Sequence, residues 1–268
     1  MTTLEKIVVL IDADNTQLKK LELVLQDVST HGRIVVKRAY GNWKKESLKN
    51  WEDEIKRLAI KAEQQFDYVA GKNATDMALV IDAIELLNSK IYDGFVIVSS
   101  DSDYTPLSIK LHESGVYVIG VGEHKTPESF RNSCDEFVFL ENLDISQSSK
   151  YENVAQGIST EKPAGMIATA PMDSHDGGES ANTYANSSTD LQIVHTLLRK
   201  AWETYQDDDE YVNVSSAGTY IKRIKPDFDV RSYGYSKLPK LIEAYPQNYD
   251  MKKYRGKGTV TIVAYKCK

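Results

Sequence analysis

Four aspartates have the residue type and spacing to bind a metal ion. Asp12 ends the apolar run "KIVVLIDADN", whereas Asp101 and Asp103 follow a second apolar run in "VIVSSDSDYTPL". Asp76 lies in "KNATDMAL", within the first turn of an expected helix. Carboxylate oxygens without histidine or cysteine favour Mg²⁺ or Mn²⁺ over Zn²⁺. The aspartates therefore predict a magnesium or manganese site if the fold brings them together.

Clustered carboxylates repel one another, and a divalent cation would compensate that repulsion. Two like charges about 4 Å apart repel by roughly 4 kcal/mol at an effective dielectric constant near 20. Each aspartate taken singly could instead be a helix cap or a turn residue. We expect Asp14 to be such a cap, and Asp82 lies six residues beyond Asp76, off its helical face. Neither belongs to the predicted ligand set.

Alternating strands and helices must position these aspartates. Amphipathic stretches predict helices, including one over 46–64 and one capped by Thr75. The alternation predicts an α/β fold with a mainly parallel sheet and helices on both faces. Ligands of such sheets bind beyond the carboxyl ends of the strands, so the carboxylates converge if the strands before Asp12 and Asp101 are neighbours. The apolar runs predict strands at 7–11, 34–40, 66–70, 94–99, 116–121 and 137–140.

Other chemistries lack their characteristic residues. The five histidines form no ligand-spaced pair, and Cys134 and Cys267 suit neither a cysteine zinc site nor a disulfide framework. The motifs of P-loop hydrolases, dinucleotide oxidoreductases and α/β-hydrolases are missing. The apolar runs are too short to span a bilayer, and no signal peptide is recognisable. We therefore expect a cytoplasmic protein.

Charge is distributed unevenly along the 268 residues, which carry a net charge of -6. Residues 211–268 hold twelve Lys or Arg against four acids, a surplus of +8, so the remainder carries -14. Residues 146–188 are rich in Ser, Thr, Ala, Gly and Asn without apolar periodicity, which predicts a flexible linker. We expect an acidic domain over 1–145 and a basic domain over 189–268. The basic domain either attracts a polyanion or exposes solvated lysines.

Residues 4–143 resemble the NYN domain, the LabA-like branch of the PIN-like nucleases. The resemblance rests on successive blocks, "VVLIDADN", "GKNATDMALVIDAIELL", "GFVIVSSDSDYTPLSIKLHESGVYVIGVG" and "SFRNSCDEFVFL". It implies a Rossmann-like fold and a metal-dependent ribonuclease that leaves a 5′-phosphate and a 3′-hydroxyl. By position, the four aspartates match the family's acidic metal ligands and Asn15 matches its polar partner, so all five are the implied catalytic residues.

Several residues near the predicted site could contact RNA or the metal ligands. Lys72 lies where related domains often carry a lysine, and Arg38 lies in "KRAYGNWKK", where cations and aromatics suit a single strand. A solvated loop lysine and packed aromatics are the alternatives. Ser99, Ser100 and Ser102 could hydrogen-bond the metal ligands or serve only as loop residues.

The basic domain resembles the OST-HTH or LOTUS domain. The resemblance is carried by "SSAGTYIKRIKPDFDVRSYGY" and "GYSKLPKLIEAYP". Three helices, one capped by Ser215 or Ser216, and a terminal hairpin predict a small winged-helix fold. The resemblance implies RNA binding, or protein binding in some members, and the charge surplus favours phosphate contacts. Tyr233 and Tyr235 either stack on bases or pack in the core. The basic candidates are Lys222, Arg223, Lys225, Arg231, Lys237, Lys240, Lys252, Lys253, Arg255 and Lys257.

These features together predict a Mg²⁺-dependent or Mn²⁺-dependent ribonuclease whose tethered LOTUS domain captures RNA for a weakly binding, acidic catalytic domain. Two alternatives stay open: a non-catalytic RNA-binding adaptor or regulator that keeps the nuclease fold, and a small-molecule phosphatase of the same sheet class. RNA is the expected partner, and no membrane is expected. A homo-oligomer or a protein partner could form through the LOTUS domain.

Overall fold

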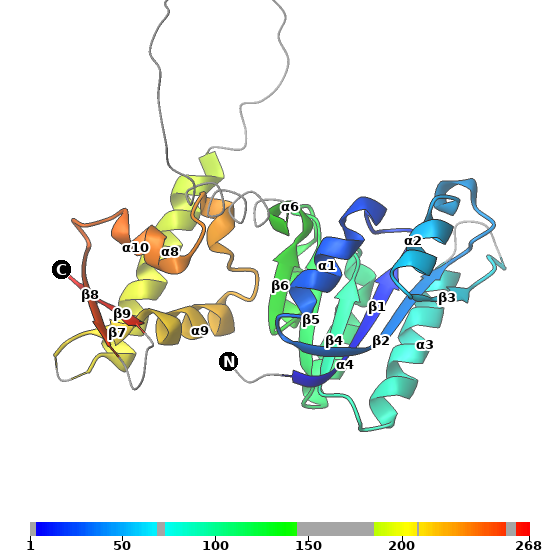
Figure 1. Ribbon diagram of the computed structural model, residues 1–268, viewed down its shortest axis with the longest axis horizontal. Coiled ribbons are helices and arrows are strands. Elements are labelled where there is room, and N and C mark those ends of the chain that lie inside the picture. Colours follow the sequence, from blue (N-terminus) through cyan, green and yellow to red (C-terminus); the bar gives the residue numbers. More distant parts are fainter. Residues whose placement is uncertain (1–3, 69–72, 144–184, 208, 256–260) are drawn as a thin grey trace, which may run out of the picture.

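The computed structural model describes residues 4–68, 73–143, 185–207, 209–255 and 261–268, and only the backbone of 185–190 (Figure 1). Lys72, Lys257 and most of the predicted linker lie outside the described residues. Helix α8 (Ala185–Tyr205) begins four residues before the expected start of the basic domain. The predicted linker therefore ends in the first turn of a helix.

A six-stranded sheet forms the N-terminal domain. Its order is β3-β2-β1-β4-β5-β6, and every neighbouring pair is parallel. β1 lies beside β4, with Ile11 opposite Val98, so the condition under which Asp12 and Asp101 converge is met. The strands are β1 (Leu4–Asp12), β2 (Gly32–Gly41), β3 (Lys61–Gln64), β4 (Gly94–Val98), β5 (Tyr117–Gly122) and β6 (Glu136–Phe139).

Helices cover both faces of this sheet, which confirms the expected α/β fold class. Three short 3₁₀ turns precede helices, namely η1 (Leu18–Lys20), η2 (Glu46–Leu48) and η3 (Ser102–Tyr104). On one face lie α1 (Leu21–Val28), α2 (Trp51–Arg57) and α6 (Leu140–Leu143), and on the other lie α3 (Ala74–Asn88), α4 (Thr105–Glu113) and α5 (Glu128–Ser133).

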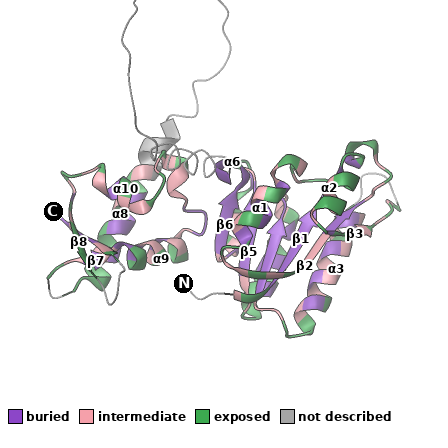
Figure 2. Ribbon diagram, in the orientation of Figure 1, coloured by how far each residue is buried: buried purple, intermediate pink, exposed green. Residues whose placement is uncertain are grey.

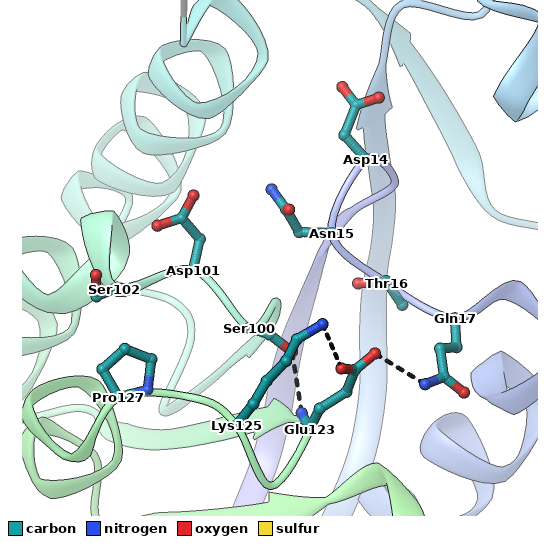
Figure 3. A pocket seen from close by; sticks show the side chains of 10 residues that line it. All are labelled: Asp14, Asn15, Thr16, Gln17, Ser100, Asp101, Ser102, Glu123, Lys125 and Pro127. Atoms are coloured by element: carbon teal, nitrogen blue, oxygen red, sulfur yellow. Dashed lines mark hydrogen bonds and ion pairs between the residues drawn. The ribbon is translucent and has the colours of Figure 1, made fainter. Parts of the chain in front are cut away.

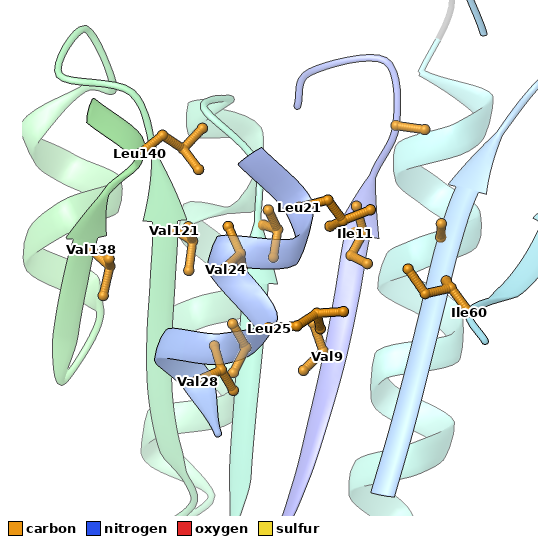
Figure 4. Close-up of a cluster of buried hydrophobic side chains, with 14 of the residues drawn as sticks. Val9, Ile11, Leu21, Val24, Leu25, Val28, Ile60, Val121, Val138 and Leu140 are labelled. Atoms are coloured by element: carbon orange, nitrogen blue, oxygen red, sulfur yellow. The ribbon is translucent and has the colours of Figure 1, made fainter. Parts of the chain in front are cut away.

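Strand β1 shows why the central strands are continuous apolar runs. Ile7, Val9 and Ile11 face α1, whose apolar side chains pack over them (Figure 4). Val8 and Leu10 point the other way, towards α3 and α4. Since both faces of a parallel strand are covered, polar residues have no place within it. The strand is consequently buried along most of its length (Figure 2).

The third strand lies at Lys61–Gln64, so the strand predicted at 66–70 is wrong at 66–68, and residues 69 and 70 lie outside the described residues. The helix predicted over 46–64 is also wrong in its second half, because α2 ends at Arg57 and Ala59 adopts φ 51°. β3 is a short edge strand of mostly exposed side chains, so "KAEQ" has no apolar pattern. Pairing with β2 overrides its helical propensity.

Two predicted helix caps are wrong by two or three residues. Asn73 occupies the capping position of α3, and Thr75 is buried in the first turn. Asn213 caps α9 (Val214–Ile224), and its side-chain oxygen accepts a hydrogen bond from the N–H of Ser215. Asn, Ser and Thr cap helices about equally well, so a segment that contains several of them does not identify the cap.

The C-terminal domain folds around its own core, which includes the buried side chains of Leu198, Ile221 and Tyr265. The expected helices and terminal hairpin are present, and a short strand joins the hairpin to give the sheet order β7-β9-β8. Among the described helices, none has the length and apolar character needed to cross a membrane. The remaining elements are β7 (Val212–Asn213), η4 (Val230–Tyr233), α10 (Leu238–Glu243), β8 (Tyr249–Arg255) and β9 (Thr261–Cys267).

Candidate functional site

Asp12 is fully buried at the carboxyl end of β1. Its Oδ1 accepts hydrogen bonds from the N–H groups of Asp14 (3.1 Å) and Asn15 (3.2 Å). Its Oδ2 accepts from Asn15 Nδ2 and Ser99 Oγ, both at 2.9 Å. Burial raises the pKa of Asp12, although the donors of Asn15 and Ser99 oppose this shift. Four donors thus hold a buried carboxylate in one orientation, as burial of such a group requires.

The hydroxyl of Tyr104 lies among three of the predicted aspartates. Tyr104 is fully buried at the end of η3, and its hydroxyl donates to Asp76 Oδ1 at 2.9 Å. Burial, followed by the negative charges of Asp12, Asp76 and Asp101, raises the pKa of Tyr104 far above its ordinary value. The fold therefore brings together the end of β1, the first turn of α3 and the segment after β4. Sequence reasoning missed Tyr104, because no motif distinguishes it from a core aromatic.

Asp103 lies on the same rim of the sheet. Its N–H donates to Asp101 Oδ1 at 2.9 Å, and its Oδ2 accepts from Asn73 Nδ2 at 2.9 Å. Burial raises the pKa of Asp76, Tyr104 opposes this shift, and the charges of Asp101 and Asp103 reinforce it. Across the described ranges, no three Asp, Glu, His or Cys side chains form a ready ligand set for a metal ion. The aspartates share a rim, but they do not form a closed coordination shell.

Asp14 also lies at this rim, and the expectation that it caps the next helix is wrong. Gln17 precedes η1, and no side chain caps that turn. Asp14 Oδ2 instead lies 3.1 Å from Lys45 Nζ. Figure 3 shows the side chains of Asp14, Asn15 and Asp101 pointing to the same side of the loops that carry them. Asp14 is thus an acid of the rim that already has a cationic partner.

A hollow beside Asp101 contains further groups that the sequence did not reveal (Figure 3). Lys125 Nζ lies 2.6 Å from Glu123 Oε2, and Glu123 Oε1 accepts a hydrogen bond from Gln17 Nε2 at 2.8 Å. Ser100 Oγ accepts from the N–H of Glu123 at 3.0 Å. Glu123 and Lys125 follow β5, and they reach the site because β5 pairs with β4 in the sheet.

Arg38, a predicted RNA contact, forms an ion pair between β2 and α3. Its Nη1 lies 2.5 Å from Asp82 Oδ1, and Asp82 also accepts a hydrogen bond from the hydroxyl of the buried Tyr40. Asp82 therefore belongs to a different cluster from the four aspartates, as expected. RNA contact by Arg38 stays a prediction, and it would compete with this ion pair.

The basic side chains of the C-terminal domain have different surroundings. Lys240, Lys252 and Lys253 form ion pairs with acids of the same domain. Lys222 instead pairs with Glu136 of the N-terminal domain. Tyr233 and Tyr235 pack against the C-terminal core, in agreement with the core alternative. Of the basic residues predicted to contact RNA, Arg223, Lys237 and Arg255 are exposed and form no ion pair with a described residue.

Comparison with known proteins agrees with this division into two domains. A family model of the NYN domain matches residues 6–141, and a model of the OST-HTH/LOTUS domain matches residues 187–261. No curated protein matches the chain significantly.

Two solved structures are similar to part of the chain. A protein of unknown function from Vibrio parahaemolyticus is 19% identical, and the match covers 52% of this chain and 96% of that chain with a TM-score of 0.42. An uncharacterized protein from Nitrosomonas europaea is 22% identical, with 39% and 92% covered and a TM-score of 0.26. The match to the family model spans half of the chain, and the chain belongs to the NYN domain family, with an OST-HTH/LOTUS domain after its NYN domain.

Proposed function

We propose that the protein is a Mg²⁺-dependent or Mn²⁺-dependent ribonuclease, which hydrolyses phosphodiester bonds in RNA that its LOTUS domain binds. The observation that best supports this proposal is the group of Asp12, Asp76 and Asp101 around the hydroxyl of Tyr104. The NYN domain has a nuclease-like fold, and the LOTUS domain is an RNA-binding type of domain. We assign catalysis to residues 1–145 and RNA capture to residues 189–268, with 146–188 as the linker.

The charges at the rim suit a hard divalent cation. Within the described residues, no Lys or Arg forms an ion pair with Asp12, Asp76, Asp101 or Asp103, whereas Asp14 has Lys45. The first four carboxylates therefore lack the positive charge that would offset their repulsion. An ion with a preference for oxygen ligands would supply it.

Three carboxylates keep an oxygen available for such an ion. Asp76 Oδ2, Asp101 Oδ2 and Asp103 Oδ1 accept no hydrogen bond from the described residues, since each of these side chains uses its other oxygen. Asp103 is exposed and Asp101 is half-buried, so both side chains have room to rotate towards Asp76. These residues therefore fit a magnesium or manganese ion, with Asp12 as the buried, fixed member of the set.

The chain's own residues would orient the ligands. A bound Mg²⁺ ion supplies an activated water molecule and charge neutralisation at the scissile phosphate and the leaving oxygen. Asn15 and Ser99 hold Asp12, and Tyr104 holds Asp76. Such supporting hydrogen bonds keep metal ligands oriented between turnovers.

Two lysines at the rim would meet the RNA backbone. Lys45 and Lys125 are each paired with an acid of the hollow, and these pairs are at least partly exposed. An incoming phosphate could replace either acid at modest cost, because exposed ion pairs contribute little to stability. Both lysines are therefore candidate positioning residues for the substrate.

Cleavage of a labelled RNA panel by the full chain tests the proposal. We expect fragments with Mg²⁺ and none with EDTA, whereas Asp12→Asn and Asp101→Asn should lose cleavage and still retain RNA. Asp53→Asn provides a matched control, because Asp53 is exposed on α2 and should cleave like the wild type. Equal cleavage by the wild type and both site variants, unaffected by EDTA, would contradict the proposal.

A second candidate is a non-catalytic RNA-binding adaptor. The observation in its favour is that the described carboxylates do not form a ready ligand set. An adaptor would bind the RNA panel without producing fragments in Mg²⁺ or Mn²⁺. Turnover of phosphate monoesters in the same experiment would instead identify a small-molecule phosphatase.

A further inference from the structure

The outer edge of β6 is covered by the LOTUS domain. β6 is the last strand in the order of the NYN sheet, and the N–H of Phe137 donates to the carbonyl oxygen of Pro226 at 2.9 Å (Figure 1). An edge strand presents backbone groups that must be paired, covered or protected by charge. The segment between α9 and η4 provides that cover.

A buried acid of the NYN domain is paired with a cation of the LOTUS domain. Glu136 is 7% exposed, and it accepts hydrogen bonds from Lys222 Nζ of α9 and, at 3.2 Å, from His31 Nε2. Burial alone would raise the pKa of Glu136, but His31 and Lys222 outweigh burial and hold that pKa at about 2. Glu136 therefore remains charged within the interface.

A buried acid of the LOTUS domain is likewise paired with a cation of the NYN domain. Asp227 of the LOTUS domain is 5% exposed and pairs with Arg131 Nη1 of α5. Lys225 Nζ lies 3.0 Å from its other oxygen. Each domain thus contributes one buried carboxylate, and the other domain contributes a cation to it.

A third contact extends the interface along α6. Asn142 Nδ2 donates to Asp229 Oδ2 at 3.0 Å and to Ser232 Oγ at 2.9 Å. Arg231 Nη2 lies 2.6 Å from Asp229 Oδ2. Burial raises the pKa of Asp27 on α1, and the charge of Arg231 opposes this shift. Arg231 is therefore near an acid of the NYN domain as well as its own Asp229.

Reciprocal pairing of buried charges distinguishes this surface from an incidental contact between two tethered domains. A buried charge is costly unless a partner of opposite charge compensates it, and each buried carboxylate has a cation of the other domain as a partner. We propose that the LOTUS domain docks on the β6 edge through the pairs Glu136–Lys222 and Asp227–Arg131, so that the two domains form one unit in solution.

This docking goes beyond the proposed nuclease function, and it does not depend on RNA cleavage. It also divides the basic residues of the LOTUS domain into two groups. Lys222 pairs across the interface and Arg231 pairs with Asp229, which accepts a hydrogen bond from Asn142 of the NYN domain. The neighbouring Arg223 is exposed and available to a phosphate.

Pulsed EPR on the full chain tests the docking. Asp53→Cys and Lys200→Cys place one spin label on an exposed position of each domain, while the native thiols of Cys134 and Cys267 are buried. We expect a narrow distribution of label distances. Lys222→Glu should broaden it, and the charge exchange Glu136→Lys with Lys222→Glu should narrow it again.

The control must separate docking from folding. Lys253→Glu reverses the same charge on an exposed strand of the LOTUS domain and should leave the distribution narrow. Circular dichroism must show that all variants are folded. Arg131→Glu tests the second ion pair independently and should broaden the distribution. Two results would overturn the proposal. One is a broad distribution of label distances in the doubly labelled protein with its native interface, and the other is a distribution that neither Lys222→Glu nor Arg131→Glu changes.

Discussion

Substitution of Asn15 by alanine tests how the site holds its buried carboxylate. Asn15 Nδ2 is one of two donors to Asp12 Oδ2, while the two backbone donors to Oδ1 stay in place in Asn15→Ala. A hydrogen bond to a charged group contributes about 1.5–3 kcal/mol. At 1.4 kcal/mol for each factor of ten, this corresponds to roughly a 10–100-fold loss, which is the range for residues that orient metal ligands.

The expected result is a higher Mg²⁺ requirement. In cleavage assays, the half-saturating Mg²⁺ concentration of Asn15→Ala should rise by roughly 10–100-fold. The free Mn²⁺ signal in EPR titrations measures the same loss of affinity without depending on cleavage. Because the Asn15 donor lowers the pKa of Asp12, its loss should also move the acid limb of the pH profile to higher pH.

Gln17→Ala is the matched control for this experiment. Gln17 lines the same hollow and donates to Glu123, outside the group of four aspartates. Its substitution should leave the metal requirement near that of the wild type. The reasoning fails if Asn15→Ala binds Mn²⁺ normally, or if Gln17→Ala shifts the metal requirement equally.

Three further predictions concern charge. Burial and neighbouring carboxylates raise the pKa of Asp76 above 3.8, so its ionisation destabilises the fold as pH rises. After allowance for solvent screening, Asp76→Asn should stabilise the metal-free protein by up to about 1 kcal/mol. Calorimetry should show this as a rise in Tm of roughly 2–4 °C. The hydrogen bond to Glu136 raises the pKa of His31 above 6.5, despite burial. Protonated His31 therefore stabilises the fold fully below pH 6.5, and this stabilisation is lost as the pH rises through the folded-state pKa of His31. When Tm is measured at a series of pH values, His31→Gln should remove this decline. Arg223→Ala should reduce the salt slope of RNA binding by about 1, and Lys222→Ala should change it less because Lys222 is engaged in the interface.

The parallel sheet and its acidic rim could be predicted because local patterns reflect them directly. A strand covered on both faces must be apolar throughout, as β1 is from Ile7 to Ile11. The polar residues that follow such strands must then lie at one rim, because all the strands are parallel. The strand pattern therefore predicts Asp12 and Asp101 at the rim. It does not predict β3, since an exposed edge strand needs no apolar pattern.

Local sequence patterns are enough to predict the two domains, the α/β class and the aspartates that follow the central strands, because burial and strand direction act on neighbouring residues. Three further contacts depend on the three-dimensional arrangement: Tyr104 lies among the aspartates, Asp14 pairs with Lys45, and Lys222 pairs across the domain interface. Each of these contacts joins residues far apart in the chain or on separate elements. Such contacts depend on sheet order and domain docking, which hydrophobic periodicity and local propensity do not encode.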